Sequence, residues 1–262
     1  MLRGGSKLIL TIDIGNSSIV TGVFKQDHLE NIFRSSKTTE KTSDEYGMLL
    51  YSFFQHHHYS FSDVEGVILS SVVPSIMHRF KKMCRDYFKI DPVIVGPGVK
   101  TGLNILYDDP KEVGSDRIAN AVAAISLYEA PCIVIDIGTA TTFCYIDEKH
   151  RYRGGVIAPG AALSADALSM NASRLPQIEL QKPKHVINKT TLSSIHSGTY
   201  YGYLSMIDGM IERMKKEERQ RNVVVIATGG LVDLYANESE TIQYVDQNLT
   251  LKGLKMIYDR NK

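Results

Sequence analysis

The pattern of apolar and polar positions along the chain predicts a similar order of elements in each half. Three strands come first, and helices alternate with the strands that follow. Short apolar runs predict strands, and apolar positions three to four residues apart predict helices. In the first half, the strands cover residues 8–12, 19–24, 28–36, 64–70 and 92–95, and the helices cover 43–54 and 76–88. After a helix at 117–128, the strands cover 132–137, 139–147, 151–158, 223–227 and 241–245, and the helices 161–170, 191–218, 231–235 and 248–258.

One sequence marks the start of both halves. Ile-Asp-Ile-Gly places Asp13 at the end of the first strand and Asp136, 123 residues later (136 − 13), at the end of its counterpart. A turn of small polar residues and a second strand follow each acid. We therefore expect an α/β fold of two similar halves, with the two acidic hairpins facing one cleft. The Gly- and Pro-containing stretch 96–110 predicts the boundary, which gives domains at residues 1–113 and 114–262.

An acid at the end of an apolar strand, followed by a glycine turn, suits an anionic ligand. The turn's N–H groups can face phosphate oxygens, and the carboxylate can hold a bridging Mg²⁺. An ordinary hairpin with a chance acid has the same pattern, and a relic of the repeat without a ligand is the alternative interpretation of Asp136. The strand ending in Thr228-Gly229-Gly230 lets a ring or a phosphate approach the backbone.

A second set of candidates lies at the predicted helix start Gly114-Ser115-Asp116-Arg117. The helix dipole there favours a charged carboxylate at Asp116, and the guanidinium of Arg117 suits a ligand carboxylate. A helix cap and a surface ion pair are the alternative interpretations of these two residues.

Composition and charge argue against several classes of protein. The chain has 262 residues, 43% of them hydrophobic, and a net charge of +1, which argues against binding to nucleic acid or to an acidic membrane surface. No apolar run is long enough to span a bilayer, and residues 1–7 lack the apolar core of a signal peptide. The three cysteines lack metal or redox spacing, which favours a cytoplasmic protein. His56-His57-His58 predicts a solvated helix end.

The paired acidic hairpins and the Gly-Gly turn resemble the nucleotide cleft of the acetate and sugar kinase, heat-shock 70 and actin superfamily. The ordered set of motifs is similar to that of the type III pantothenate kinase family nearly end to end. The motifs are Asp13-Ile14-Gly15-Asn16-Ser17, Gly114-Ser115-Asp116-Arg117, Asp136-Ile137-Gly138-Thr139-Ala140, Gly154-Gly155 with Pro159-Gly160, and His196-Ser197-Gly198 before Tyr201-Gly202. Two positions depart from the family's usual residues, Ser115 in place of alanine and Ser17 in place of threonine.

The resemblance implies two ribonuclease H-like (actin-like) halves, each a mixed β-sheet flanked by helices, with the active site in the cleft between them. It implies ATP-dependent phosphorylation of (R)-pantothenate to 4'-phosphopantothenate, the first step of coenzyme A biosynthesis, and it implies a homodimer. The expected ATP contacts are Asp13, Ile14, Gly15, Asn16, Ser17, Ser18, Ile19, Val20 and Thr139. The expected substrate contacts are Tyr107, Gly114, Ser115, Asp116, Arg117 and Thr191.

The resemblance also assigns three acids. Asp116 is the expected catalytic base, Asp13 the acid that orients Mg²⁺ directly or through water, and Asp136 the ligand of a monovalent cation, K⁺ or NH₄⁺. Gly229-Gly230 is a further candidate ATP contact, and the helical stripe from Leu204 to Met214 is the candidate subunit contact if it is not core. Two other functions stay open: a nucleotide-binding regulatory protein on the same fold, and a kinase of another small alcohol such as a sugar.

Overall fold

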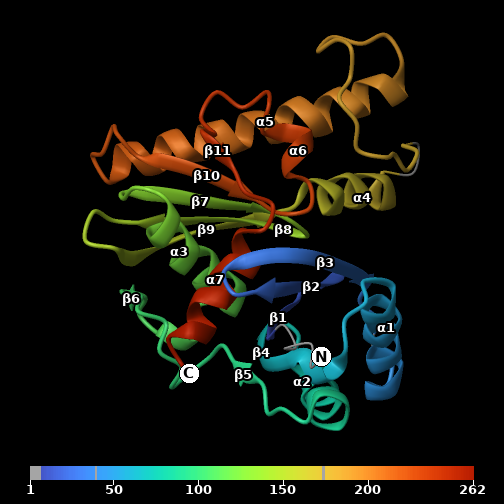
Figure 1. Cartoon of the computed structure of the whole chain (residues 1–262). Coiled ribbons are helices and arrows are strands. Elements are labelled where there is room, and N and C mark those ends of the chain that lie inside the picture. The colour runs from blue at the N-terminus through green and yellow to red at the C-terminus, as the bar shows by residue number, and fades with distance from the viewer. Residues whose placement is uncertain (1–6, 39, 173–174) are drawn as a thin grey trace. The chain divides into compact units, whose positions relative to one another are not determined.

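The computed structural model describes residues 7–38, 40–172 and 175–262. Residues 1–6 of the polar N-terminal stretch lie outside the described residues. The first residue of the predicted loop 174–189 does so too. The chain forms two units (Figure 1). The first comprises the chain up to Leu103, Asp108–Ala123 and Leu249–Lys262, and the second comprises Asn104–Tyr107 and Ala124–Asn248. No helix in the described part of the chain is both long and apolar enough to cross a membrane.

The first unit is built on a five-stranded mixed sheet in the order β3-β2-β1-β4-β5. Its strands are β1 (Leu8–Ile14), β2 (Ser18–Lys25), β3 (His28–Ser36), β4 (Val64–Ser71) and β5 (Val93–Ile94). β1, β2 and β3 form an antiparallel meander, whereas β4 and β5 add in parallel. The parallel pairs need helical crossovers, which α1 (Ser43–His56) and α2 (Pro74–Met83) supply.

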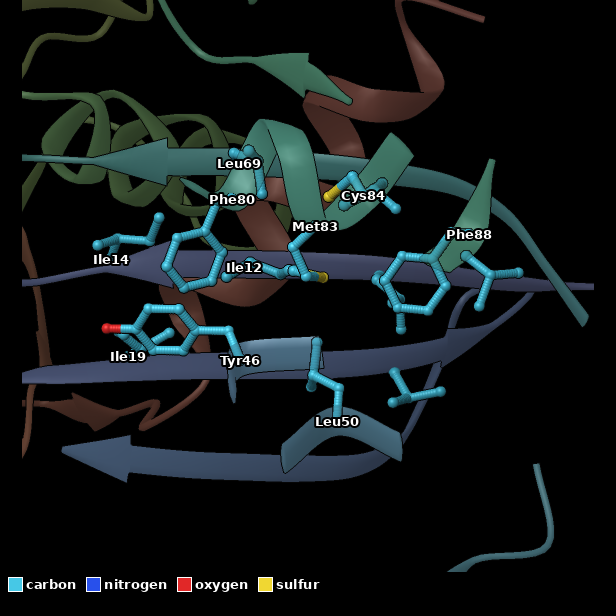
Figure 2. Close-up of a cluster of buried hydrophobic side chains, with 14 of the residues drawn as sticks. Ile12, Ile14, Ile19, Tyr46, Leu50, Leu69, Phe80, Met83, Cys84 and Phe88 are labelled. Carbon is cyan, nitrogen blue, oxygen red and sulfur yellow. The ribbon is translucent and has the colours of Figure 1, made fainter. Parts of the chain in front are cut away.

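Helices α1 and α2 cover one face of this sheet (Figure 2). Ile12 and Ile14 of β1 point into the cluster, where the ring of Tyr46 on α1 lies 4.6 Å from that of Phe80 on α2. A capping box of Thr42 and Glu45 begins α1. A single π-helical segment, Cys84–Phe88, follows α2, so the helix predicted at 76–88 changes its hydrogen-bonding pattern near its end.

Helix α7 (Leu249–Asp259) lies against β1 in the first unit, where Leu251 packs with Ile9 and Phe24. It also approaches the first turns of α3 (Ser115–Leu127) closely: a Cβ on Gly253 would lie 1.9 Å from the carbonyl oxygen of Ala119. These contacts assign α7 and the start of α3 to the first unit. These two units divide the chain differently from domains 1–113 and 114–262, which stay a prediction.

The second unit repeats the first sheet. Its strands are β7 (Cys132–Ile137), β8 (Ala140–Ile146), β9 (Arg151–Pro159), β10 (Val224–Thr228) and β11 (Tyr244–Val245). They run β11-β10-β7-β8-β9, with β7, β8 and β9 antiparallel and β10 and β11 parallel. Taken in the opposite direction, β9-β8-β7-β10-β11, this order matches β3-β2-β1-β4-β5 of the first sheet strand for strand. The predicted duplication is therefore confirmed. A sixth strand, β6 (Asn104–Ile105), adds to β9 and was not predicted, since it lies in the stretch expected to be loop.

The helices of the second unit are α4 (Ala161–Asn171), α5 (Thr191–Glu217) and α6 (Val232–Tyr235). Leu204, Ile207 and Ile211 of α5 are buried against Ile133 and Ile135 of the second sheet. The stripe that the sequence offered as a subunit contact is therefore core of its own unit, and the assignment as a contact is wrong.

The cysteines behave as small apolar core residues, as expected. Cys84, Cys132 and Cys144 are buried thiols, and burial raises the pKa of Cys84 and of Cys132 to about 12. At pH 7 these thiols are protonated and therefore poor nucleophiles.

Candidate active site

The first acidic hairpin joins β1 to β2. Asp13 pairs with Val20 across it, so all eight residues expected to contact ATP here, Asp13 to Val20, lie in one turn and its two strand ends. The Gly15 N–H donates to the Ser18 carbonyl at 3.0 Å, and a Cβ on Gly15 would lie 3.1 Å from the same oxygen. The turn is therefore tight at Gly15, and Asn16, Ser17 and Ser18 are exposed to a ligand.

The start of α3 holds Asp116 in a defined position. The Ile118 N–H donates to the Gly114 carbonyl at 3.0 Å, and the Arg117 N–H donates to Asp116 Oδ1 at 2.8 Å. The carboxylate folds back over Gly114, where a Cβ would lie 2.5 Å from Oδ1. A side chain at position 114 would therefore displace the Asp116 carboxylate from this position, and the Asp116 side chain is half-buried.

Arg117 is buried, with 8% of its surface exposed. Its Nη2 donates to the Glu112 carbonyl at 3.2 Å. Part of the guanidinium therefore holds the loop that leads into α3.

Strand β4 connects the hairpin to the helix start. Asp13 is in register with Ser70 on the neighbouring strand, and the Val72 N–H donates to the Ile14 carbonyl at 3.2 Å. The Ser70 Oγ lies 2.9 Å from the Ser115 Oγ. The structure thus brings Asp13 and Asp116 to the same end of the first sheet, two residues that are 103 positions apart in the sequence (116 − 13).

The second acidic hairpin joins β7 to β8 in the second unit. The Gly138 N–H donates to the Ala140 carbonyl at 3.2 Å, and the Gly160 N–H donates to the Thr139 carbonyl at 3.1 Å. Gly160 is the cap of α4, and a Cβ there would lie 2.3 Å from the Gly138 carbonyl. The turn that carries Thr139 is consequently packed against the N-terminus of α4, a position that favours anions.

Asp136 lies against the glycine turn after β10, as the repeat requires, because Thr228 pairs with Asp136 in register. A Cβ on Gly229 would lie 2.6 Å from Asp136 Oδ1 and 2.6 Å from the Ile137 carbonyl oxygen. Only a glycine permits this close approach. A carboxylate beside backbone carbonyls is a hard oxygen donor set, which fits an alkali cation.

No group of three or more His, Cys, Asp or Glu side chains in the described part of the chain could hold a metal ion by itself. A single carboxylate with phosphate oxygens and water is the usual environment of Mg²⁺ in kinases. Asp13 beside a phosphate-binding turn fits that arrangement, and His56-His57-His58 belongs to no such group.

Tyr203 of α5 reaches the second hairpin. Its hydroxyl is hydrogen-bonded to Thr141 Oγ1 on β8. Burial raises the pKa of Tyr203; the hydrogen bonds with Thr141 and Ala161 oppose the rise, and the negative charge of Asp136 adds to it. The phenol is therefore neutral at physiological pH and fixes α5 to the strand that follows Asp136.

The other two expected substrate contacts also lie in the second unit. Tyr107 follows β6, and its ring centre lies 6.3 Å from that of Tyr152 on β9. A Cβ on Gly154, which has φ +135°, would lie 3.8 Å from the ring of Tyr107. The unpredicted strand β6 is therefore the element that positions Tyr107.

Thr191 is at the start of α5, where Thr190 caps the helix by accepting the Ser193 N–H at 3.2 Å. It lines a groove of about 950 Å³ between α4 and α5, away from the residues that contact Tyr107. The groove is also lined by Pro159, Leu168, Ser194, Gly198 and Gly202. We call it the α4–α5 groove.

Sequence reasoning missed Ser70, Thr141 and Tyr203 as parts of this arrangement. In the repeat, Ser70 at the end of β4 corresponds to Thr228 at the end of β10, because each pairs with the acid of its hairpin. Ser71 corresponds to Gly229. Applying the repeat to the end of the fourth strand would have identified Ser70. Tyr203 gives no such signal, because a tyrosine on a buried helix face is common in any core.

Comparisons with known proteins agree with one another. The family model for type III pantothenate kinase matches residues 9–213. A type III pantothenate kinase of Shouchella clausii is 64% identical over 256 residues, which are 97% of this chain and 100% of that protein.

Two solved structures share the fold. One is described as a conserved putative Baf family transcriptional activator from Campylobacter jejuni; it is 20% identical, with a TM-score of 0.60, over 96% of this chain and 98% of that one. The other, a putative 2-dehydro-3-deoxygalactonokinase from Sinorhizobium meliloti, is 12% identical with a TM-score of 0.56, over 95% of each chain. The predicted α/β fold class, with mixed sheets flanked by helices, is confirmed.

Proposed function

Because the chain belongs to the type III pantothenate kinase family, we propose that it transfers the γ-phosphoryl group of ATP to the primary hydroxyl of (R)-pantothenate, giving 4'-phosphopantothenate for coenzyme A biosynthesis. One observation of the structure supports this reaction most directly. Asp116 is held at a helix start at the same end of the sheet as the Asp13 hairpin, which places an acid for the acceptor beside a turn suited to phosphate.

Phosphoryl transfer needs positioning and charge neutralisation more than covalent chemistry. In the proposed site, the N–H groups and hydroxyls of Asp13–Val20 hold the phosphates of ATP, and Thr139 contributes from the second hairpin. Asp13 holds Mg²⁺, directly or through water; the ion neutralises charge on the phosphate oxygens when it is bound. Gly229 and Gly230 leave room for the nucleotide at the end of β10.

The acceptor side of the proposed site is built on α3. Asp116 Oδ2 accepts the proton of the pantothenate hydroxyl, or orients that hydroxyl, while Oδ1 stays bonded to the Arg117 N–H. Gly114 and Ser115 shape the pocket, and the guanidinium of Arg117 meets the pantothenate carboxylate, because its planar fork of N–H donors suits a carboxylate. Tyr107 and Thr191 complete the proposed substrate contacts.

The proposed monovalent cation, K⁺ or NH₄⁺, is bound by Asp136. The oxygen donors gathered at this turn support the assignment, since the Asp136 carboxylate and the Ile137 carbonyl both lie close to Gly229. The cation would neutralise the carboxylate at the second hairpin, so that a phosphate can approach Thr139.

Product formation tests the function. We expect the purified chain with ATP, Mg²⁺, K⁺ and pantothenate to produce a phosphomonoester that ³¹P NMR and mass spectrometry identify as 4'-phosphopantothenate. Replacing K⁺ by Na⁺ should lower the rate. ATP binding without any product would contradict the proposal and favour a regulatory protein, and a product formed only with a sugar would favour the other kinase class.

We also propose that the chain is a cytoplasmic homodimer that assembles through the α4–α5 groove. The groove's floor is open backbone, because an added Cβ at Gly198 or Gly202 would meet no atom within 4 Å. Large apolar side chains of α4, of α5 and of the segment between these helices are exposed, and Leu168 lines the groove. They are Leu163, Leu168, Met170, Val186, Ile187 and Leu192. An apolar patch of this kind on a soluble protein indicates a protein contact, and the face of a second copy is apolar in the same way.

Gly202→Leu tests this contact. The side chain has space within the protomer, so we expect the fold to persist while the dimer dissociates, as measured by sedimentation velocity with circular dichroism as the check on folding. Gln55→Leu, which adds the same side chain at an exposed position of α1, is the control and should remain dimeric. A dimeric Gly202→Leu protein would contradict the proposed interface.

A further inference from the structure

Two serine hydroxyls join the end of β4 to the start of α3. Ser70 is completely buried, and Ser115 has 9% of its surface exposed. Their Oγ atoms lie 2.9 Å apart, although the residues are 45 positions apart in the chain. Neither hydroxyl is needed to begin the helix, because Ile118 already bonds to the Gly114 carbonyl.

The Ser115 hydroxyl uses its full hydrogen-bonding capacity at this point. It accepts the Ser71 N–H at 3.0 Å and donates to the Ser71 carbonyl at 3.2 Å. A hydroxyl has one hydrogen to donate and two lone pairs to accept with. With Ser70 donating to the second lone pair, all three are satisfied, and the first residue of α3 is fixed to two consecutive residues of β4.

This contact decides where Asp116 lies. Asp116 follows Ser115 directly, and its carboxylate is fixed locally by the Arg117 N–H and by the close approach to Gly114. Ser70 is in register with Asp13 on the adjacent strand, and paired positions of neighbouring strands face the same side of a sheet. The serine pair thus sets the position of Asp116 relative to Asp13.

We propose that Ser70 and Ser115 act together as positioning residues that hold Asp116 in line with the Asp13 hairpin. This inference rests on the proposed role of Asp116. A displacement of about 1 Å can cost roughly 100-fold in rate when reacting groups must be aligned.

Three variants test the proposal: Ser115→Ala, Ser70→Ala and the double variant. For Ser115→Ala we expect kcat to fall by about tenfold, less than the roughly 100-fold that a 1 Å displacement can cause. The KM for ATP should stay unchanged, because the 13–20 hairpin is intact. The double variant should be no slower than Ser115→Ala, because Ser115→Ala already removes the only bond to Ser115 that Ser70→Ala would break. Amide hydrogen exchange should accelerate at Ser71 and in the first turn of α3.

Ser239→Ala is the matched control. The Ser239 hydroxyl bonds to Asp208 and accepts the Thr241 and Ile242 N–H groups, so it is comparably engaged but contacts none of the proposed site residues. It should lower the melting temperature without changing kcat. The positioning role is overturned if Ser115→Ala has the kcat of the unmodified chain, if Ser239→Ala slows turnover equally, or if the single effects multiply. An unmodified chain that makes no phosphopantothenate overturns the proposed function instead.

Discussion

Asp116→Asn is expected to lower kcat for pantothenate phosphorylation by about 1,000-fold, within the range that a positioned general base contributes. Asparagine has the shape of aspartate, and its side-chain oxygen can still accept the Arg117 N–H that Asp116 Oδ1 accepts at 2.8 Å. The amide cannot take a proton from the acceptor hydroxyl. The fold and the hairpin proposed to bind ATP should therefore persist while the chemical step is lost.

The measurement is the initial rate of phosphopantothenate formation, together with calorimetric titration of ATP to confirm that binding is retained. Asp44→Asn is the control, because Asp44 is also the second residue of a helix that begins with serine. It faces Tyr87 rather than the proposed site, and its variant should keep the full rate. A rate for Asp116→Asn close to that of the unmodified chain would reject Asp116 as the base.

Gly229→Ala is expected to have the largest effect on stability. Gly229 has φ +104°, and a Cβ there would lie 2.6 Å from Asp136 Oδ1, from the Ile137 nitrogen and from the Ile137 oxygen. A side chain at positive φ costs about 1–2 kcal/mol, and forcing an atom into a packed site costs a further 1–3 kcal/mol or so. We expect the melting temperature to fall by about 10 °C, using roughly 2–4 °C for each kcal/mol in a protein of this size.

The neighbouring glycine supplies the control. A Cβ on Gly230 would meet nothing within 4 Å, so Gly230→Ala adds the same methyl group one residue away and should leave the melting temperature nearly unchanged. Scanning calorimetry of the two variants compares the positions directly. Equal melting temperatures would contradict the account of a closed cradle around Asp136.

The sequence predicted the repeated sheet because its signal is local. Ile-Asp-Ile-Gly at two positions marks two strand ends, and each strand of the meander pairs with the one before it. It did not predict β6, since Asn104 and Ile105 form a strand only by pairing with β9, far along the chain. β6 also lies in the Gly- and Pro-containing stretch 96–110, whose composition predicts loop.

In the candidate site, too, the sequence predicted the residues in local motifs but not the contacts between distant segments. Asp13, Asp116 and Asp136 stand in motifs and were found from the sequence, and the structure adds that Asp13 and Asp116 lie at one end of the first sheet. The proposed role of Ser70 depends on its contact with Ser115. Neither segment has a local sequence pattern that would predict this contact. The α5 stripe was misassigned as a contact because an apolar helix face looks the same whether a sheet or a second copy covers it.

The most direct test of the central claim is a crystal structure of the chain with pantothenate, Mg²⁺ and a non-hydrolysable ATP analogue. The account predicts that Asp116 Oδ2 lies about 3 Å from the primary hydroxyl of pantothenate, with the phosphates of the analogue against the Asp13–Val20 hairpin. A pantothenate hydroxyl bound out of reach of Asp116, or phosphates bound away from that hairpin, would contradict it.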